Sequence, residues 1–112
     1  MQSALERRDS ILRALSRRRE DRIENLAAEF GVSEKTIRRD IELLSCSAPI
    51  STKTGPGGGV SVMPGYYYGR QYLKKEQETL LRSLLPGLQP DQQRIMQDIL
   101  DSYAMPTVTP GQ

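Results

Sequence analysis

Residues 33–41 read SEKTIRRDI and carry the clearest structural pattern of the chain. The first residue of this stretch is a serine, whose hydroxyl can accept a hydrogen bond from a backbone N–H group that has no partner at the start of a helix. Ile37, Ile41 and Leu44 then recur at the spacing of a single helical face. The sequence therefore predicts an amphipathic helix over residues 33–45, with one side in a core and the other exposed.

Two further helical patterns precede this segment. Apolar residues repeat at helical spacing over residues 4–15, and the charged run RRREDR at residues 17–22 ends that pattern. A second apolar stripe covers residues 23–30, and Gly31 suits the left-handed conformation that often ends a helix. Because only Val32 separates this glycine from the next helix cap, we expect a tight turn between the second and third helices.

A short β-hairpin is predicted after the third helix. Pro49 closes that helix, and β-prone runs follow at residues 50–54 and 60–63. The sequence GPGGG at residues 55–59 joins the two runs, and its glycines permit the positive φ angles of a tight hairpin tip. Pro64 then marks the expected end of the first domain.

Two more helices are predicted in the C-terminal part. One apolar pattern covers residues 74–85, and a second covers residues 91–103, with Asp91 as the expected N-cap. A segment bounded by prolines separates them, so we expect a helical hairpin within a second domain at residues 65–105. Residues 106–112 are expected to form a frayed tail.

The order of these elements predicts the fold class. Three helices, with a tight turn before the third and a hairpin after it, are the order of a winged helix-turn-helix domain, in which the hairpin is the wing. We therefore predict a mostly α protein with a small β-hairpin wing. The winged helix-turn-helix is expected over residues 1–64 and is followed by the C-terminal helical hairpin.

The outward face of helix 33–45 supplies the candidate contacts to the major groove of double-stranded DNA. With the apolar residues inward, Lys35, Arg39 and Glu42 point away from the core. Lys35 and Arg39 can donate to guanine O6 and N7, and Glu34 can accept from cytosine N4, so these three are the predicted base contacts. The predicted phosphate contacts are Ser33, Thr36 and Arg38 on the helix and Lys53 with Thr52 or Thr54 on the wing.

Other notable residues receive structural interpretations. The carboxylate of Asp40 would repel phosphate, so we expect it to form an ion pair with an arginine of the same domain. The tyrosines at residues 66–68 are expected to pack against protein rather than to stack on bases. Residues 17–19 are three arginines, which we expect to be solvated at a helix end rather than bound to phosphate. Cys46 is interpreted as a small buried apolar residue rather than a redox sensor.

The N-terminal half of the chain resembles the DeoR-type helix-turn-helix family. Arg7, Ile11 and Leu15 match its spaced arginine and aliphatic positions, and residues 33–41 match its recognition-helix pattern SxxTIRRDI. The following sequence GPGGGVSV looks like the wing of the same family. The resemblance covers about residues 5–63 and implies a bacterial transcription repressor or activator, of which we favour a repressor.

The resemblance does not extend to a sensing domain. Typical members of this family, and the similar WYL-domain regulators, continue into a ligand-sensing domain, for which residues 64–112 leave no room. We expect either a short stand-alone regulator, which we favour, or an N-terminal fragment of a larger ligand-responsive regulator. No small-molecule effector is evident. The C-terminal helices are expected to pair two copies into a homodimer; in the alternative, the winged helix is a scaffold and these helices recruit another protein.

Composition argues against several other classes of protein. The chain of 112 residues has no His and a single Cys, so we expect no metal site, no cofactor and no enzymatic activity. The GPGGG sequence lacks the Lys and Ser or Thr that complete a nucleotide-binding P-loop. No apolar run approaches the roughly 18 residues of a membrane span, and the first ten residues do not form a signal peptide. We therefore expect a cytoplasmic protein.

Overall fold

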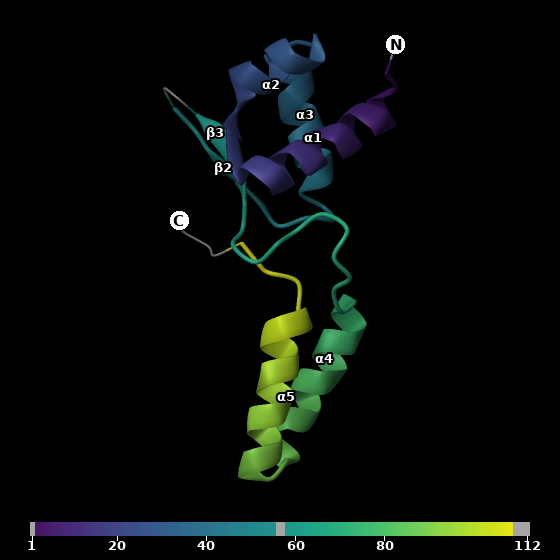
Figure 1. Ribbon diagram of the computed structural model, residues 1–112, viewed down its shortest axis with the longest axis vertical. Helices are drawn as coiled ribbons and strands as arrows, with labels where there is room; N and C mark the ends of the chain where they lie inside the picture. The colour runs from purple at the N-terminus through teal and green to yellow at the C-terminus, as the bar shows by residue number, and fades with distance from the viewer. Residues whose placement is uncertain (1, 56–57, 109–112) are drawn as a thin grey trace. The chain divides into compact units, whose positions relative to one another are not determined.

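The computed structural model describes residues 2–55 and 58–108, which fall into two compact units. The first contains the described residues up to Tyr68 together with those from Pro106 onward, and the second is Gly69–Met105. Figure 1 shows the elements of the first unit in purple to teal and the helical pair of the second in green to yellow. Within the described ranges, no helix combines the length and apolar character needed to cross a membrane.

Three helices form the helical part of the first unit: α1 (Ala4–Arg18), α2 (Ile23–Phe30) and α3 (Glu34–Leu44). Ser33 caps α3, and its hydroxyl accepts a hydrogen bond of 3.1 Å from the backbone N–H of Thr36. Gly31 ends α2 in the left-handed conformation, with φ of 66°. Both observations confirm the predicted short connection between α2 and α3.

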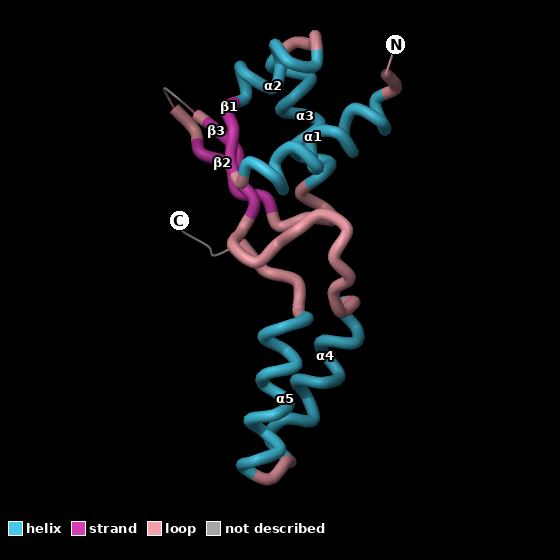
Figure 2. The backbone as a smooth tube through the Cα atoms, viewed as in Figure 1, coloured by secondary structure: helices cyan, strands magenta, loops and turns pink. Residues whose placement is uncertain are grey.

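Three short antiparallel strands complete the first unit: β1 (Glu20–Arg22), β2 (Ile50–Lys53) and β3 (Gly59–Val62). β2 and β3 form the predicted hairpin, in which Ile50 pairs with Val62. β1, which the sequence analysis did not predict, pairs with the other edge of β3, so that β3 is the central strand. The magenta strands of Figure 2 therefore include a segment that lies between α1 and α2 in the chain, which ties the wing to the helices.

The core of the first unit lies among the three helices and one face of the sheet. Ile11, Leu15, Leu26 and Ile37 have no exposed surface. On β3, alternation of side chains along the strand turns Val60 and Val62 to the same face, and both are buried. The inward residues predicted for α3 are Ile37, Ile41 and Leu44, and all three are buried. The mostly helical fold with a small wing is thus confirmed.

The second unit contains α4 (Lys75–Leu84), the single 3₁₀ turn η1 (Leu85–Gly87) and α5 (Pro90–Tyr103). Figure 1 shows α4 and α5 side by side and antiparallel, as the predicted helical hairpin requires. The cap of α5 is Gln89 rather than Asp91, because Pro90 already suits the first helical position with its fixed φ and missing N–H group. The backbone N–H of Gln89 donates to the side chain of Gln92 at 3.1 Å.

Candidate nucleic-acid interface

The outward face of α3 carries two basic side chains. Lys35 and Arg39 lie one helical turn apart and are both exposed. Neither has a hydrogen-bond or ion-pair partner in the part of the chain that the structure describes. Ile37 and Ile41 hold the opposite side of the helix in the core. The helix is therefore fixed by its apolar face, while its two outward cations are available to a ligand.

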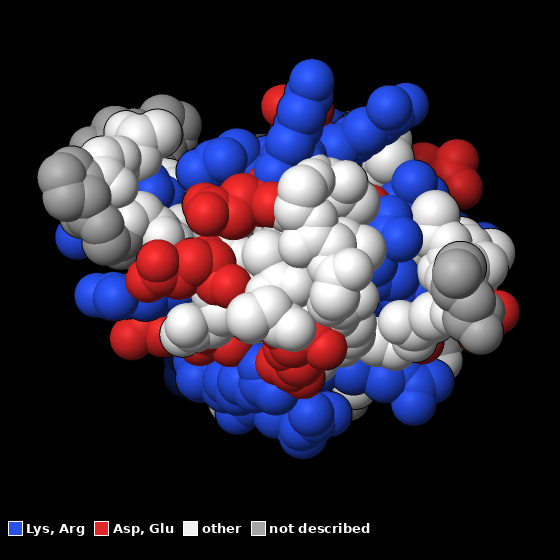
Figure 3. Space-filling model, turned by 90° about the horizontal axis from the view of Figure 1, so that it is seen from above, with Lys and Arg blue, Asp and Glu red and all other residues white. Residues whose placement is uncertain are grey.

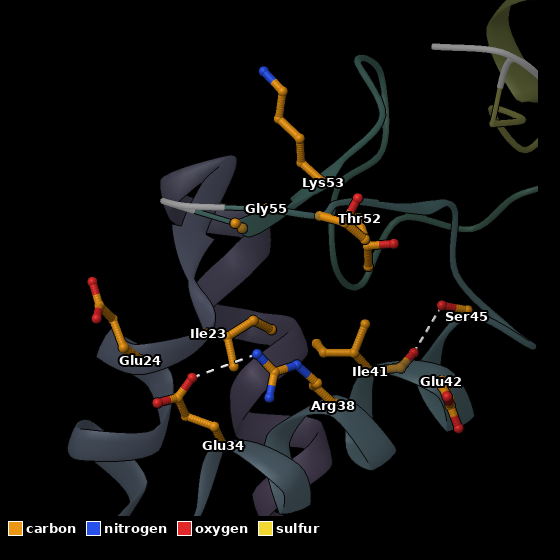
Figure 4. A pocket seen from close by; sticks show the side chains of 13 residues that line it. Ile23, Glu24, Glu34, Arg38, Ile41, Glu42, Ser45, Thr52, Lys53 and Gly55 are labelled. Atoms are coloured by element: carbon orange, nitrogen blue, oxygen red, sulfur yellow. Dashed lines mark hydrogen bonds and ion pairs between the residues drawn. The ribbon is translucent and has the colours of Figure 1, made fainter.

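Glu34 and Arg38 form an ion pair along α3. Arg38 Nη2 lies 3.5 Å from Glu34 Oε1, and both side chains are more than half exposed. The dashed line between them is visible in Figure 4. The structure thus brings together one residue predicted to contact a base and one predicted to contact phosphate, with opposite charges.

An open cleft of about 510 Å³ lies between α3 and the wing (Figure 4). Arg38 lines it from α3, and Lys53 and Thr54 line it from the wing. In Figure 4 the side chain of Lys53 extends away from Arg38. The cleft also contains carboxylates, from Glu24, Glu34 and Glu42. Its surface is therefore of mixed charge, with cations on both sides of the gap.

Ser33 and Thr36 form a hydroxyl pair at the start of α3. Ser33 Oγ lies 3.0 Å from Thr36 Oγ1, in addition to its cap bond with the Thr36 backbone. One of the two hydroxyl protons forms the hydrogen bond between Ser33 and Thr36. The other proton can be donated to an acceptor outside the protein, such as a phosphate oxygen. These two predicted phosphate contacts therefore form a single donor site.

Asp40 forms the predicted ion pair with arginines of the same domain, and these arginines lie on α1. Its Oδ2 accepts a hydrogen bond of 2.6 Å from Arg7 Nε, and its Oδ1 accepts one of 3.1 Å from Arg8 Nε. The side chain of Asp40 is 1% exposed. The buried carboxylate is thus compensated by two guanidinium groups, and it sets the position of α3 against its neighbour.

Most other arginines of the first unit are also neutralised within that unit. The ion pairs join Arg13 to Asp9, Arg18 to both Asp21 and Glu29, and Arg22 to Glu24. In the described part of this unit, the basic side chains without a hydrogen bond or ion pair are Arg17, Lys35, Arg39 and Lys53, and of these Arg17 still interacts electrostatically with Glu29. Three of these four lie on α3 and the wing. Figure 3 shows side chains of both charges on the face that it presents, so this surface is not uniformly basic. What distinguishes α3 and the wing is that Lys35, Arg39 and Lys53 have no ion-pair partner in the described residues.

Arg19 contradicts the expectation that residues 17–19 are solvated, because its guanidinium is turned toward the protein. It connects α1 to β1 with a positive φ of 74°, which is unusual for a residue other than glycine. Its guanidinium donates hydrogen bonds to the carbonyl oxygens of Ser16, at 2.8 Å, and Tyr66, at 2.6 Å. It also lies over the ring of Tyr67, 4.4 Å from the ring centre. One inward-turned arginine therefore holds the chain where it leaves the wing.

The tyrosine segment packs against α1. Tyr66 is buried, and the backbone N–H of Tyr68 donates to Ser16 Oγ at 2.8 Å. The hydroxyl of Tyr68 donates to Asp9 Oδ1 at 2.6 Å, and this hydrogen bond lowers the pKa of the Asp9 carboxyl. Packing in the core is thus found for Tyr66, whereas Tyr67 and Tyr68 remain exposed and are held at the surface by their contacts with Arg19 and Asp9.

Cys46 is exposed, which contradicts its interpretation as a buried apolar residue. α3 ends at Leu44, the last inward position of its apolar stripe, and Cys46 lies in the turn beyond it. The predicted wing tip includes residues 56–57, which lie outside the described residues, as does most of the expected tail, residues 109–112.

The chain is similar to known helix-turn-helix proteins. Residues 7–60 match the family described as the DeoR-like helix-turn-helix domain. The chain is 37% identical over 85 residues to the uncharacterized HTH-type transcriptional regulator YobV of Bacillus subtilis (strain 168). This alignment covers 75% of the chain but 27% of that protein, so the chain spans about a quarter of the relative's length. No solved structure matches the chain. The matched residues 7–60 begin within α1 and end within β3, so this part of the chain is similar to the DeoR-like helix-turn-helix domain.

Proposed function

We propose that the protein binds double-stranded DNA at specific sequences and thereby regulates transcription. The observation that carries this proposal is the distribution of unpaired cations. Ion pairs and carbonyl contacts occupy most arginines of the first unit, whereas Lys35, Arg39 and Lys53 on α3 and the wing have no partner in the described residues. Cations concentrated on a helix and its adjacent wing are the electrostatic pattern of a DNA-binding surface.

In this proposal α3 enters the major groove, and its two outward cations read bases. Lys35 and Arg39 donate to guanine O6 and N7, and each good contact of this kind discriminates by about 1–3 kcal/mol against a wrong base. Glu34 accepts from cytosine N4 when it releases Arg38, with which it forms an ion pair in the absence of DNA.

The phosphate contacts in this proposal come from both sides of the cleft. Arg38 and the hydroxyl pair of Ser33 and Thr36 contribute from α3, and Lys53 with Thr54 contributes from the wing. Such contacts position the protein on the duplex without reading its sequence. A single module of this size buries only about 600–1,000 Å² of its surface on DNA, so that a second copy would add affinity.

The C-terminal hairpin, formed by α4 and α5, is proposed to bind a second copy of the chain. Five large apolar side chains on α4 and α5 are between 39% and 61% exposed: Leu80, Leu84, Ile95, Ile99 and Tyr103. They recur four residues apart on each helix, which places them in a stripe along the helix. Pairing two hairpins across a two-fold axis covers these stripes and gives a homodimer that reads two half-sites about 34–36 Å apart.

Light scattering of the purified chain tests the homodimer. Ile95→Lys places a charge in the apolar stripe and should convert dimer to monomer. Asp101→Lys places the same side chain at an exposed position on the opposite side of α5 from the stripe and should leave the dimer intact. A monomeric wild-type chain at high concentration would contradict this part of the proposal.

A regulatory role is supported by the name of the Bacillus relative, which describes a transcriptional regulator. We favour repression, because a protein bound in the major groove of a promoter sterically excludes other proteins from the same DNA. The direct test is to compare expression from a promoter that carries the selected site in cells with and without the protein. Lower expression with the protein supports repression, and higher expression identifies an activator.

The experiment that tests the function as a whole is selection of bound sequences from a random duplex library at moderate salt. An enriched inverted repeat with half-sites about one helical turn apart supports sequence-specific binding by a dimer. Absence of enrichment by the folded protein would contradict DNA recognition. It would favour the competing function, in which the exposed apolar stripes of α4 and α5 recruit a different protein.

A further inference from the structure

Three charged residues form a row along the outward side of α3: Lys35, Arg39 and Glu42. At 100° per residue, Lys35 and Glu42 point in nearly the same direction, and Arg39 lies about 40–60° to one side of them. All three side chains are exposed. The row therefore continues beyond the two cations and ends in a carboxylate.

Glu42 is the acidic residue of α3 without a partner in the described chain. Glu34 is paired with Arg38, and Asp40 is buried against Arg7 and Arg8. Glu42 follows Arg38 and Arg39 by one helical turn, yet neither arginine forms an ion pair with it. Its two oxygens keep their capacity to accept hydrogen bonds from outside the protein.

An unpaired carboxylate on a DNA-facing helix restricts what it can meet. It repels phosphate, and it also repels the acceptor atoms that guanine and thymine present in the major groove. Cytosine offers an amino group, N4, with no acceptor of its own on that edge, whereas adenine places its N7 acceptor beside its amino group. Cytosine is therefore the base whose edge suits Glu42 best.

We propose that Glu42 is a specificity-determining residue that selects cytosine in each half-site. This inference rests on the proposed DNA-binding function and adds to it a position that the motif residues do not cover. In the outward row, Lys35 and Arg39 then donate to acceptor atoms of the bases, and Glu42 accepts from the amino group of a cytosine.

The spacing of the row sets where that cytosine lies. A helix rises about 1.5 Å per residue, so Glu42, three positions after Arg39, lies about 4.5 Å further along the helix axis. Base pairs are about 3.4 Å apart. The cytosine read by Glu42 should therefore lie one or two base pairs from the position read by Arg39.

The test is selection from a random duplex library with the wild-type chain, Glu42→Gln, Glu42→Ala and the control Glu20→Gln, which changes an exposed glutamate on β1. The wild type and the control should enrich cytosine at one position of each half-site by roughly tenfold or more. Glu42→Gln should change this preference to adenine, because a glutamine amide both donates to N7 and accepts from N6. Glu42→Ala should relax the preference at this position alone.

The outcomes separate this inference from the function on which it rests. If the wild type enriches a site and both Glu42 variants select the same site with unchanged preference, the role of Glu42 is overturned while DNA recognition stands. If the wild type enriches no site, the proposed function itself fails and this inference fails with it.

Discussion

Arg7 and Asp40 meet through two hydrogen bonds, one of 2.6 Å from Arg7 Nε to Asp40 Oδ2 and one of 3.1 Å from Arg7 Nη2 to Asp40 Oδ1. The guanidinium belongs to α1 and the carboxylate to α3, so this contact joins two helices that are distant in the chain. Asp40 immediately follows Arg39. The same turn of α3 therefore carries an inward anchor and an outward cation.

Asp40→Asn should destabilise the fold. The amide keeps the shape of the carboxylate but removes its charge and turns an NH₂ group toward the arginines. We expect a loss of about 2–3 kcal/mol in the free energy of unfolding, somewhat below the range for fully buried pairs because both guanidinium groups retain some exposure to water. Urea denaturation measures the loss. The control Glu20→Gln should change stability by less than about 0.5 kcal/mol, and a similar value for Asp40→Asn would refute the anchoring role.

Substitutions of Arg19 should separate backbone strain from side-chain contacts. Both Arg19→Ala and Arg19→Gly remove the hydrogen bonds to the carbonyl oxygens of Ser16 and Tyr66. Only glycine adopts the φ of 74° without strain, so Arg19→Gly should be more stable than Arg19→Ala by about 1 kcal/mol. Thermal unfolding of the two variants side by side checks the order. Equal stabilities would show that the positive φ contributes no strain.

Gly59→Ala should disrupt the pairing of β1 with β3. A Cβ at this position would lie 2.8 Å from the carbonyl oxygen of Asp21, which is backbone and cannot rotate away. We expect a loss of about 1–3 kcal/mol, the range for overpacked sites, with faster amide exchange along β1. Gly87→Ala is the control, since an added Cβ there meets nothing within 4 Å. Unchanged exchange in β1 would contradict the close approach.

The ion pair of Glu29 with Arg18 should make stability depend on acid pH. The hydrogen bonds from Arg18 lower the pKa of Glu29 below its ordinary value of 4.5. A lowered pKa in the folded state stabilises the fold above the ordinary pKa, and this contribution disappears as the pH falls through the folded-state value. Glu29→Gln should therefore reduce stability at neutral pH, by less than about 1 kcal/mol because the pair is exposed, and the two proteins should converge in acid. A constant difference between them from pH 7 to pH 2 would argue against this pair.

Two substitutions distinguish base reading from phosphate contact. Arg39→Ala should relax preference at one position of the selected site, whereas Lys53→Ala should weaken binding to all sequences alike and reduce the salt dependence by about one phosphate contact. Binding isotherms at several salt concentrations, on selected and mismatched duplexes, measure both effects. A uniform loss of affinity in both variants would contradict the assignment of Arg39 to a base.

The helices and the caps around α3 were predictable because local rules decide them, whereas the cap of α5 was predicted at Asp91 and lies at Gln89. The stripe of Ile37, Ile41 and Leu44, the cap at Ser33 and the left-handed Gly31 all follow from spacing and residue type, and all were found. The ion pair of Asp40 was also expected, since a carboxylate on this helix would repel phosphate and is better explained by a partner within the domain.

Long-range pairing explains what the sequence did not reveal. β1 consists of three charged residues, and it is a strand because the edge of β3 accepts it, not because of its own propensity. The inward turn of Arg19 depends on carbonyl groups that come from Met63 and Tyr66, far along the chain. The pairing of Glu34 with Arg38 is local and could have been expected from their i, i+4 spacing.

The central position of β3 has a consequence for how the chain acquires its structure. Glu20 pairs with Ser61, so β1 leaves the ribosome well before its partner, with α2, α3 and β2 following in between. The contacts among the helices are closer in sequence and carry a smaller entropic cost of closure than this pairing. All three helices of the first unit are therefore synthesised before the strand that joins β1 to β2. A nascent chain that stops short of β3 lacks not only the wing but also the ordered connection between its first two helices.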